Sequence, residues 1–192
     1  MIEISWLGRG GQGVVFASRL LVNALIHEDK YCQSIIFFGA ERRGAPVRAY
    51  NRIADHHIKY HHFVYNPDVA VVFTSELLGV VKIIDELKDG GLLIVNAPSI
   101  DVIKGYLPKN KCIRVGGCNA TQIALDLGLE IAGLVVPNTA MLGAFSKLVG
   151  IPSLDSLLKA IEDTWKGRPK IVEKNTEAAR MGYEQARMFR EY

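Results

Sequence analysis

A loop near the amino terminus, Gly8-Arg9-Gly10-Gly11-Gln12-Gly13, restricts the possible folds more than any other stretch, because four of its six residues are glycine. Before it, apolar and polar residues alternate over residues 2–6, as in a half-buried β-strand. After it, residues 14–26 are apolar on nearly all sides, as in a buried α-helix. A strand, a glycine loop and a helix in this order open a βαβ unit of the nucleotide-binding type. The sequence therefore predicts an α/β fold that begins at this loop.

The glycines fit the pattern G-x-G-x-x-G at Gly8, Gly10 and Gly13. Glycine lacks a Cβ, and the N–H groups at the start of the following helix favour an anion, so the loop suits close contact with a charged group. A dinucleotide site also needs an acidic residue about 20 residues further on, which holds the ribose hydroxyls. The acid nearest to the end of the second predicted strand, at residues 34–39, is Glu41, which lies 28 residues after Gly13. A dinucleotide, another anionic ligand or partner, and a purely structural tight turn therefore stay open as explanations of the loop.

The rest of the chain alternates strands with helices and then ends in helices. Continuous apolar runs at residues 68–74 and 92–96 are typical of strands buried on both faces of a parallel sheet. Residues near 37–53 predict a hairpin-like excursion, which is uncommon in a simple nucleotide-binding unit. Further helices are predicted at residues 75–87, 120–127, 138–149, 153–165 and 170–192, with Ser75, Asn138 and Ser153 as N-caps. We expect one Rossmann-like α/β domain over residues 1–192, with a mostly parallel sheet flanked by helices and with helices at the carboxyl end.

The composition excludes several classes of function. A net charge of +3 over 192 residues does not indicate binding to nucleic acid. No apolar run approaches the ~20 residues of a membrane span and no signal peptide is recognisable, so we expect a cytoplasmic protein without membrane partners. Three scattered cysteines, Cys32, Cys112 and Cys118, form no CxxC pair, so we predict no metal site in this chain. No Ser/His/Asp or Cys/His arrangement predicts a catalytic residue.

The most unusual stretch is FFGAERRGAPV at residues 37–47, which combines two aromatic rings with a charged turn. Arginine suits carboxylate or phosphate groups, and aromatic residues beside arginine are typical of protein interfaces. A solvated turn in which Glu41 pairs with one arginine is the alternative. Small residues at 140–144 suit either close packing or contact with another subunit. The predicted interface residues are Phe38, Glu41, Arg42, Arg43, Asn138 and Thr139.

Five motifs spread over the whole chain resemble a known family. They are GRGGQGVV at 8–15, FFGAERRGAPV at 37–47, YNPD at 65–68, NTAMLGAF at 138–145 and KNTEAARMGYE at 174–184. Together they resemble the gamma subunit of the 2-oxoacid:ferredoxin oxidoreductases. The second motif is similar to that of the pyruvate branch, whereas the 2-oxoglutarate branch usually has a sequence more like PESRGG there.

The resemblance implies a part in oxidative decarboxylation, in which pyruvate, coenzyme A and oxidised ferredoxin give acetyl-CoA, carbon dioxide and reduced ferredoxin. In this family, thiamine diphosphate, Mg²⁺ and [4Fe-4S] clusters belong to the alpha, beta and delta subunits, so this chain alone would hold no cofactor and would be inactive. Ferredoxin would be an indirect partner. The gamma chain packs beside the thiamine site and is implicated in admitting coenzyme A. The loop from Gly8 to Gly13 would therefore approach coenzyme A or a partner chain, and Arg42 and Arg43 would lie at the subunit junction.

Two alternatives remain beside this expectation. The first keeps the same role in an enzyme for another 2-oxoacid, such as 2-oxoisovalerate, 2-oxoglutarate or indolepyruvate. The second is a stand-alone dinucleotide-binding module. A gamma subunit purified alone should be colourless and bind neither NAD nor FAD, and it could pair with itself as a homodimer through surfaces meant for its partners.

Overall fold

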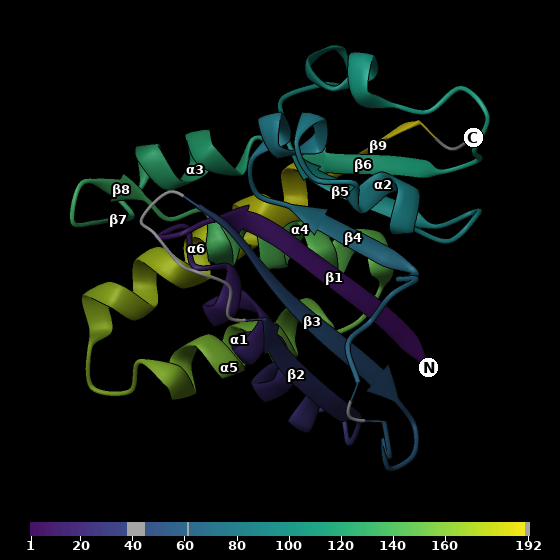
Figure 1. Cartoon of the computed structure of the whole chain (residues 1–192). Coiled ribbons are helices and arrows are strands. Elements are labelled where there is room, and N and C mark those ends of the chain that lie inside the picture. Colours follow the sequence, from purple (N-terminus) through teal and green to yellow (C-terminus); the bar gives the residue numbers. More distant parts are fainter. Residues whose placement is uncertain (38–44, 61, 191–192) are drawn as a thin grey trace.

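The computed structural model describes residues 1–37, 45–60 and 62–190. Their central feature is a seven-stranded sheet in the order β2-β3-β1-β4-β5-β6-β9 (Figure 1). Its strands are β1 (Ile2–Arg9), β2 (Tyr31–Phe37), β3 (Pro46–Ala54), β4 (Val69–Val72), β5 (Leu92–Asn96), β6 (Arg114–Cys118) and β9 (Arg187–Arg190). Strands β1, β4, β5 and β6 pair in parallel, whereas β3 and β9 run antiparallel to their neighbours. This arrangement confirms the predicted α/β class.

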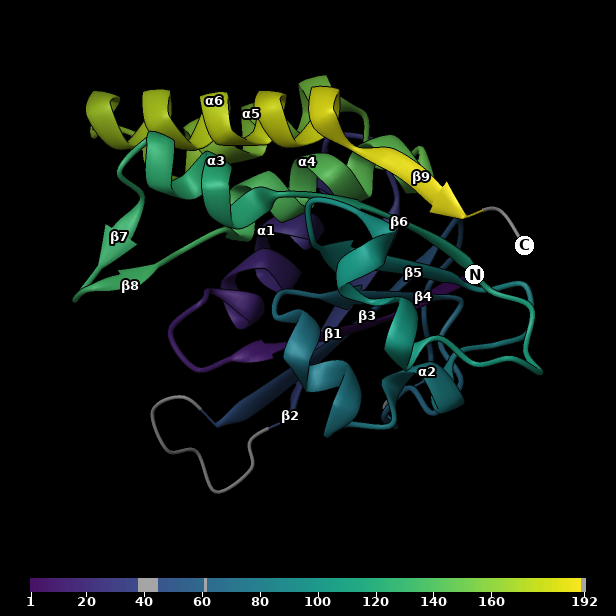
Figure 2. The same cartoon turned by 90° about the horizontal axis from the view of Figure 1, so that it is seen from above.

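The helices form a thick layer on one face of the sheet and a thin one on the other. The helices are α1 (Val14–Ile26), α2 (Ile83–Glu86), α3 (Ala120–Asp126), α4 (Asn138–Val149), α5 (Leu154–Thr164) and α6 (Pro169–Gln185). Helices α1, α4, α5 and α6 lie on one side of the sheet, and α2 lies on the other (Figure 2). A separate hairpin of β7 (Glu130–Ile131) and β8 (Leu134–Val135) extends beyond the sheet (Figure 2).

Alternation along β1 divides the core between these two layers. Ile4 and Trp6 face the thick layer, where the Trp6 ring lies 5.4 Å from the Phe145 ring of α4. Leu7 faces the thin layer and belongs to a second apolar cluster with residues of β4, β5 and α2. The central parallel strands therefore bury both faces, which explains their unbroken apolar runs.

Helices α4 and α6 pack backbone against backbone. A Cβ added to Gly143 would meet the carbonyl oxygen of Ala179 and would lie 2.8 Å from the backbone nitrogen of Tyr183. A Cβ added to Gly182 would lie 2.7 Å from the carbonyl carbon of Ala140. The small side chains at residues 140–144 therefore allow α4 to pack closely against α6 within this chain.

The predicted excursion near 37–53 is the hairpin of β2 and β3, and β3 lies between β2 and β1 in the sheet.

A buried arginine fixes the loop that follows β3. Arg52 has a fully buried side chain that pairs with Glu3 at 2.9 Å and donates hydrogen bonds to the carbonyl oxygens of His62 and Phe63. The histidine-rich stretch from residue 55 is therefore a loop held against the sheet.

Several local predictions were wrong. The last helix ends at Gln185 and not at residue 192, because the chain becomes extended at Ala186 and adds β9 antiparallel to β6. The helix predicted at 75–87 is a 3₁₀ turn followed by the short α2, and Ser75 does not cap it. Asn138 is the first helical residue of α4 and not its N-cap. The N-cap predicted at Ser153 is confirmed, since its side chain accepts a hydrogen bond from Ser156 N.

Candidate functional site

The glycine loop leaves the sheet at the carboxyl end of β1 and turns directly into α1. Gly11 and Gly13 have φ angles of 98° and 81°, which a residue with a side chain adopts only with strain. Gly10 N donates a hydrogen bond to the carbonyl oxygen of Ala45, so the loop is tied to the start of β3. In parallel sheets of this kind, ligands bind outside the carboxyl ends of the strands. The loop therefore lies at the edge where a site is expected.

Three of the glycines make room for other parts of the same chain. A Cβ on Gly8 would lie 2.9 Å from the Cβ of Phe73, which follows β4. A Cβ on Gly13 would lie 2.6 Å from Nδ2 and 3.0 Å from Cβ of Asn138, at the start of α4. A Cβ on Gly11 would collide only with the tip of the Leu134 side chain in β8. Close internal packing therefore explains why Gly8 and Gly13 have no side chain. It explains Gly11 less well, because the Leu134 side chain could move to make room.

Gln12 bridges the loop to the neighbouring strand. Its Oε1 accepts hydrogen bonds of 2.8 Å from both Arg9 N and Thr74 Oγ1. Helix α1 follows β1 on one face of the sheet, and the 3₁₀ turn Ser75–Gly79 follows β4 toward the other face, so this is the point where the connections change sides. Crevices at such points bind nucleotides in related folds. Here the Gln12–Thr74 hydrogen bond connects the loop after β1 to the residue that follows Phe73 at the end of β4.

The position of β3 disagrees with a dinucleotide site. In a simple nucleotide-binding unit, the second strand lies directly beside β1, and its end carries the acid that binds the ribose. Here β3 occupies that place, with Val47 opposite Gly8 and Pro46 opposite Arg9. Strand β2 lies one position further out and ends at Phe37. The described structure therefore offers no acid at the ribose position beside the loop.

Two helices begin at the same point of this edge. The contact between Gly13 and Asn138 places the start of α1 beside the start of α4. The described first turns of both helices contain no acidic residue. In α4, the Asn138 side chain already accepts a hydrogen bond from Thr139 N in the first turn. The dipoles of the two helices therefore concentrate positive potential there. Such a place favours a phosphate or carboxylate group.

Asn138 and Thr139, which we predicted at an interface, both have buried side chains. Asn138 Oδ1 accepts a hydrogen bond of 2.8 Å from Thr139 N. Thr139 Oγ1 donates one of 3.1 Å to Asn175 Oδ1 on α6, and Asn175 Nδ2 donates to the carbonyl oxygen of Ile171. In this structure both residues support the packing of α4, so their place at a subunit interface stays a prediction.

Asn96 is a further polar residue of this edge that the sequence did not single out. It ends β5, donates to the carbonyl oxygen of Phe73 at 3.0 Å and to Thr121 Oγ1 at 2.7 Å, and accepts from Thr121 N at 3.1 Å. Asn96 thereby connects the ends of β4 and β5 to the start of α3. The sequence could have indicated Asn96, because it is the one amide side chain at the carboxyl end of an otherwise apolar strand.

Phe38, Glu41, Arg42 and Arg43 lie outside the described residues, so their predicted interface role stays a prediction. Across residues 1–37, 45–60 and 62–190, no three His, Cys, Asp or Glu side chains converge to hold a metal ion. Within the same ranges, no helix is both long and apolar enough to span a membrane.

The cysteines differ in their surroundings. Burial raises the pKa of the Cys32 thiol to about 12, despite a hydrogen bond from Asn51 that acts in the opposite direction. Burial also raises the pKa of the Cys118 thiol to about 12. Cys112 is exposed. The two buried thiols stay protonated near neutral pH and are poor nucleophiles, because the thiolate is the reactive form.

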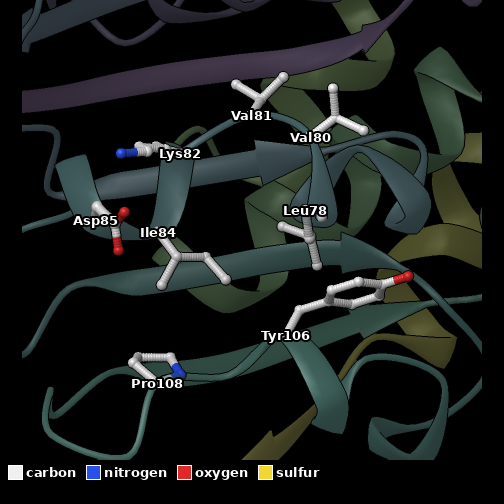
Figure 3. Close-up of a pocket in the computed structure, with 9 residues that line it drawn as sticks. Leu78, Val80, Val81, Lys82, Ile84, Asp85, Tyr106 and Pro108 are labelled. Carbon is white, nitrogen blue, oxygen red and sulfur yellow. The ribbon is translucent and has the colours of Figure 1, made fainter.

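A small pocket lies away from the glycine loop, between the segments that follow β4 and β5 (Figure 3). Its volume is ≈ 190 Å³, and Lys82 and Asp85 are the charged members of its lining. Val80 and Tyr106 are among its exposed members, at 74% and 41%. Small-molecule sites usually enclose about 300–1,000 Å³. We assign no ligand to this pocket.

Comparisons with known proteins agree with the motifs. Residues 3–185 match the family model described as pyruvate ferredoxin/flavodoxin oxidoreductase. The chain is 45% identical to the pyruvate synthase subunit PorC of Methanothermobacter thermautotrophicus, over 99% of this chain and 98% of that protein. It is 43% identical to the pyruvate/ketoisovalerate oxidoreductases common subunit gamma of Pyrococcus furiosus, over 98% of this chain and 99% of that one.

A solved structure supports the fold. The crystal structure of the pyruvate oxidoreductase subunit PORC of Thermotoga maritima superposes with a TM-score of 0.83 at 34% identity and covers 97% of both chains. The likeness thus extends over the sheet, both helix layers and the sequence. The chain belongs to the pyruvate ferredoxin/flavodoxin oxidoreductase family.

Proposed function

We propose that this chain is the accessory gamma subunit of a complex that decarboxylates pyruvate oxidatively, with coenzyme A and ferredoxin as co-substrates. The observation that carries the proposal is the full-length similarity to PorC, a subunit of pyruvate synthase, at 45% identity. The chain acts as one unit over residues 1–192. The larger of the two apolar clusters supports this, since it draws residues from Ile4 in β1 to Ala186 after α6. The proposed location is the cytoplasm.

The redox and thiamine cofactors of the complex belong to its other subunits in this proposal. Thiamine diphosphate with Mg²⁺, and [4Fe-4S] clusters, would be held by the alpha, beta and delta chains. The donor set of this chain supports that division, because the described residues bring no three metal-ligating side chains together. An iron–sulfur cluster is ordinarily held by four cysteine thiolates. We therefore derive no chemical step from residues of this chain.

The contribution of this chain would be to position coenzyme A. Helices α1 and α4 begin side by side without acidic residues in their described first turns. The dipoles of both helices suit the phosphates of coenzyme A, which the chain would hold at the glycine loop with main-chain donors at the start of α1. Gly11 is the loop residue best placed to matter, because the nearest atoms of the described residues to a Cβ added there belong to the movable side chain of Leu134. A side chain at Gly11 would narrow the approach to these helix starts.

A Gly11→Val variant of the assembled complex tests this role. We expect the KM for coenzyme A to rise roughly five- to tenfold, which corresponds to about 1–1.4 kcal/mol of lost charge stabilisation. Decarboxylation measured without coenzyme A should not change. Gly90→Val is the matched control, since Gly90 also has a positive φ of 72° but meets nothing within 4 Å. An unchanged KM for coenzyme A in a complex that carries Gly11→Val would exclude the loop from this role.

The subunit junction can be tested separately. The double variant Arg42→Glu with Arg43→Glu should weaken binding to the alpha subunit, measured by co-purification at moderate salt. The control is Lys166→Glu with Arg168→Glu, a second pair of basic residues, which is exposed in the turn between α5 and α6. Equal recovery of both double variants with the alpha subunit would contradict the interface role of Arg42 and Arg43.

A second substrate is favoured by one comparison. The Pyrococcus furiosus relative is named as a subunit common to pyruvate and ketoisovalerate oxidoreductases. This chain could likewise serve an enzyme for 2-oxoisovalerate as well as one for pyruvate. Isolation of the native complexes through a tag on this chain, followed by assay with both 2-oxoacids, distinguishes a shared subunit from one dedicated to pyruvate.

A further inference from the structure

The two outer strands of the sheet have very different edges. Strand β9 has four residues, Arg-Met-Phe-Arg, and an arginine at each end. Strand β2 has seven residues, Tyr-Cys-Gln-Ser-Ile-Ile-Phe, with no charge, proline or glycine. Proteins ordinarily protect an edge strand by keeping it short or by placing charges or proline on it. Strand β9 follows this rule and β2 does not.

Strand β2 presents an unprotected edge over its whole length. In the described sheet it pairs only with β3, along all residues from Tyr31 to Phe37, and it forms the outer border (Figure 1). None of its side chains is fully buried. Uncharged, β-branched and aromatic residues on such a strand favour pairing with another strand. The edge is therefore suited to main-chain hydrogen bonds with a further chain.

The sequence of β2 is complementary to itself. Tyr31 and Phe37 are the two exposed residues of the strand, at 48% and 44%, and their even spacing places both on the same face. In an antiparallel pair with a two-fold axis through Ser34, Tyr31 of each copy stands opposite Phe37 of the other. Cys32 then stands opposite Ile36. The contact between Tyr31 and Phe37 would therefore form twice, once at each end of the paired strands, and no two charged residues of β2 would meet.

The ends of β2 are already ordered for such a contact. The Phe37 ring lies 5.4 Å from that of Phe63, and the Tyr31 ring lies 6.1 Å from that of His57. Aromatic side chains that neighbours hold in place lose less freedom when a partner covers them. Beneath the strand, Ser34 Oγ lies 2.7 Å from Ser18 Oγ of α1, which fixes the centre of the strand on its helix.

We propose that two copies of this chain pair antiparallel through β2, with a two-fold axis at Ser34, to form one continuous sheet. A symmetric contact of this kind uses the same patch on both copies, as is usual for dimers. The pairing engages β2, whereas the proposed coenzyme A edge lies at the carboxyl end of β1. It does not depend on the proposed function, and either can fail without the other.

A cross-link tests the register directly. In the full-length chain with the exposed Cys112 replaced by serine, a Ser34→Cys variant should form a covalent dimer under mild oxidation. Opposed residues of antiparallel strands have Cα atoms about 4.5–5.5 Å apart, within the range a disulfide requires. The parent chain with Cys112→Ser keeps Cys32, which stands opposite Ile36 and should not cross-link. Absence of the Ser34→Cys cross-link, or an equal yield through Cys32, would refute this register.

Sedimentation analysis of the purified full-length chain tests the contact without a cross-link. We expect a concentration-dependent dimer whose Kd rises roughly tenfold or more in Tyr31→Lys, because two ring contacts are lost and two charges are added. Tyr65→Lys is the control, since Tyr65 is 68% exposed and lies outside the strand. Circular dichroism shows whether each variant is folded. A chain that stays monomeric at all concentrations, or a dimer that both variants weaken equally, would overturn the proposal.

Discussion

A Gly143→Ala variant tests the packing that joins α4 to α6. Alanine has a higher helix propensity than glycine, so propensity alone predicts a gain in stability of about 1 kcal/mol. The structure predicts the opposite sign. The added Cβ would collide with the carbonyl oxygen of Ala179 and would lie 2.8 Å from Tyr183 N and 2.9 Å from the carbonyl carbon of Ala179. These are backbone atoms, so no change of side-chain rotamer relieves the contact.

The magnitude follows from the distance that the helices must move. Carbon contacts are most favourable at about 3.5–4.0 Å, so α4 and α6 would have to separate by about 1 Å. Overpacking of a buried contact costs about 1–3 kcal/mol, and we take the upper end because both obstructing groups are backbone. After subtraction of the propensity gain, the free energy of unfolding should fall by about 2 kcal/mol. This corresponds to a fall in Tm of about 4–8 °C for a chain of this size.

Thermal and denaturant unfolding of the full-length chain measure this effect. Gly182→Ala should show the same sign, because its Cβ would lie 2.7 Å from the carbonyl carbon of Ala140 on the facing helix. Gly105→Ala is the control, since a Cβ there meets nothing within 4 Å, and its effect should stay within about 0.5 kcal/mol. A Tm of Gly143→Ala equal to or above that of the parent chain would refute the close approach of the two helices.

Two further results are expected. Arg52→Met should destabilise the chain by about 3 kcal/mol and increase hydrogen exchange in the loop that follows β3, because Glu3 loses its nearer ion-pair partner and two loop carbonyl oxygens lose a hydrogen bond. In thiol titration of the native chain at pH 8, Cys112 should react rapidly, and Cys32 and Cys118 only after unfolding. Since burial raises the pKa of both buried thiols from 9.0 to about 12, their contribution to stability is complete below pH 9 and is lost as the pH rises from 9 toward 12.

The sequence predicted the fold wherever hydrophobic pattern and turn residues agreed. The strand, loop and helix at the amino terminus, the buried parallel strands and the excursion near residues 37–53 are all present. The pattern was misleading at the carboxyl end, where Phe189 shares helical spacing with Ile171, Ala178 and Ala186 but belongs to β9. Its strand conformation depends on pairing with β6, a contact that a local pattern does not contain. The hairpin of β7 and β8 was missed because each of its strands has only two residues.

The candidate site was predicted less completely, because its contacts join residues far apart in the sequence. Nothing near Gly13 indicates that Asn138 is its neighbour. Gln12 was included only as a member of the loop, and its hydrogen bond to Thr74 became visible only with the strand order. The sequence placed the loop between the first strand and the first helix, as the structure has it, but it could not show which loop atoms face other parts of the chain.

These internal contacts decide how variants of the loop must be interpreted. A Cβ on Gly13 would meet the side chain and Cβ of Asn138, and one on Gly8 would meet Phe73. Loss of activity in either variant would therefore measure misplacement of α1 or α4 as much as any contact with coenzyme A. Gly11 differs, because the tip of Leu134 can rotate away. A Gly11→Val complex with an unchanged Tm and a raised KM for coenzyme A would show that the added side chain interferes with the ligand. If Leu134→Ala then restored the KM, the interference would act through a displaced hairpin of β7 and β8.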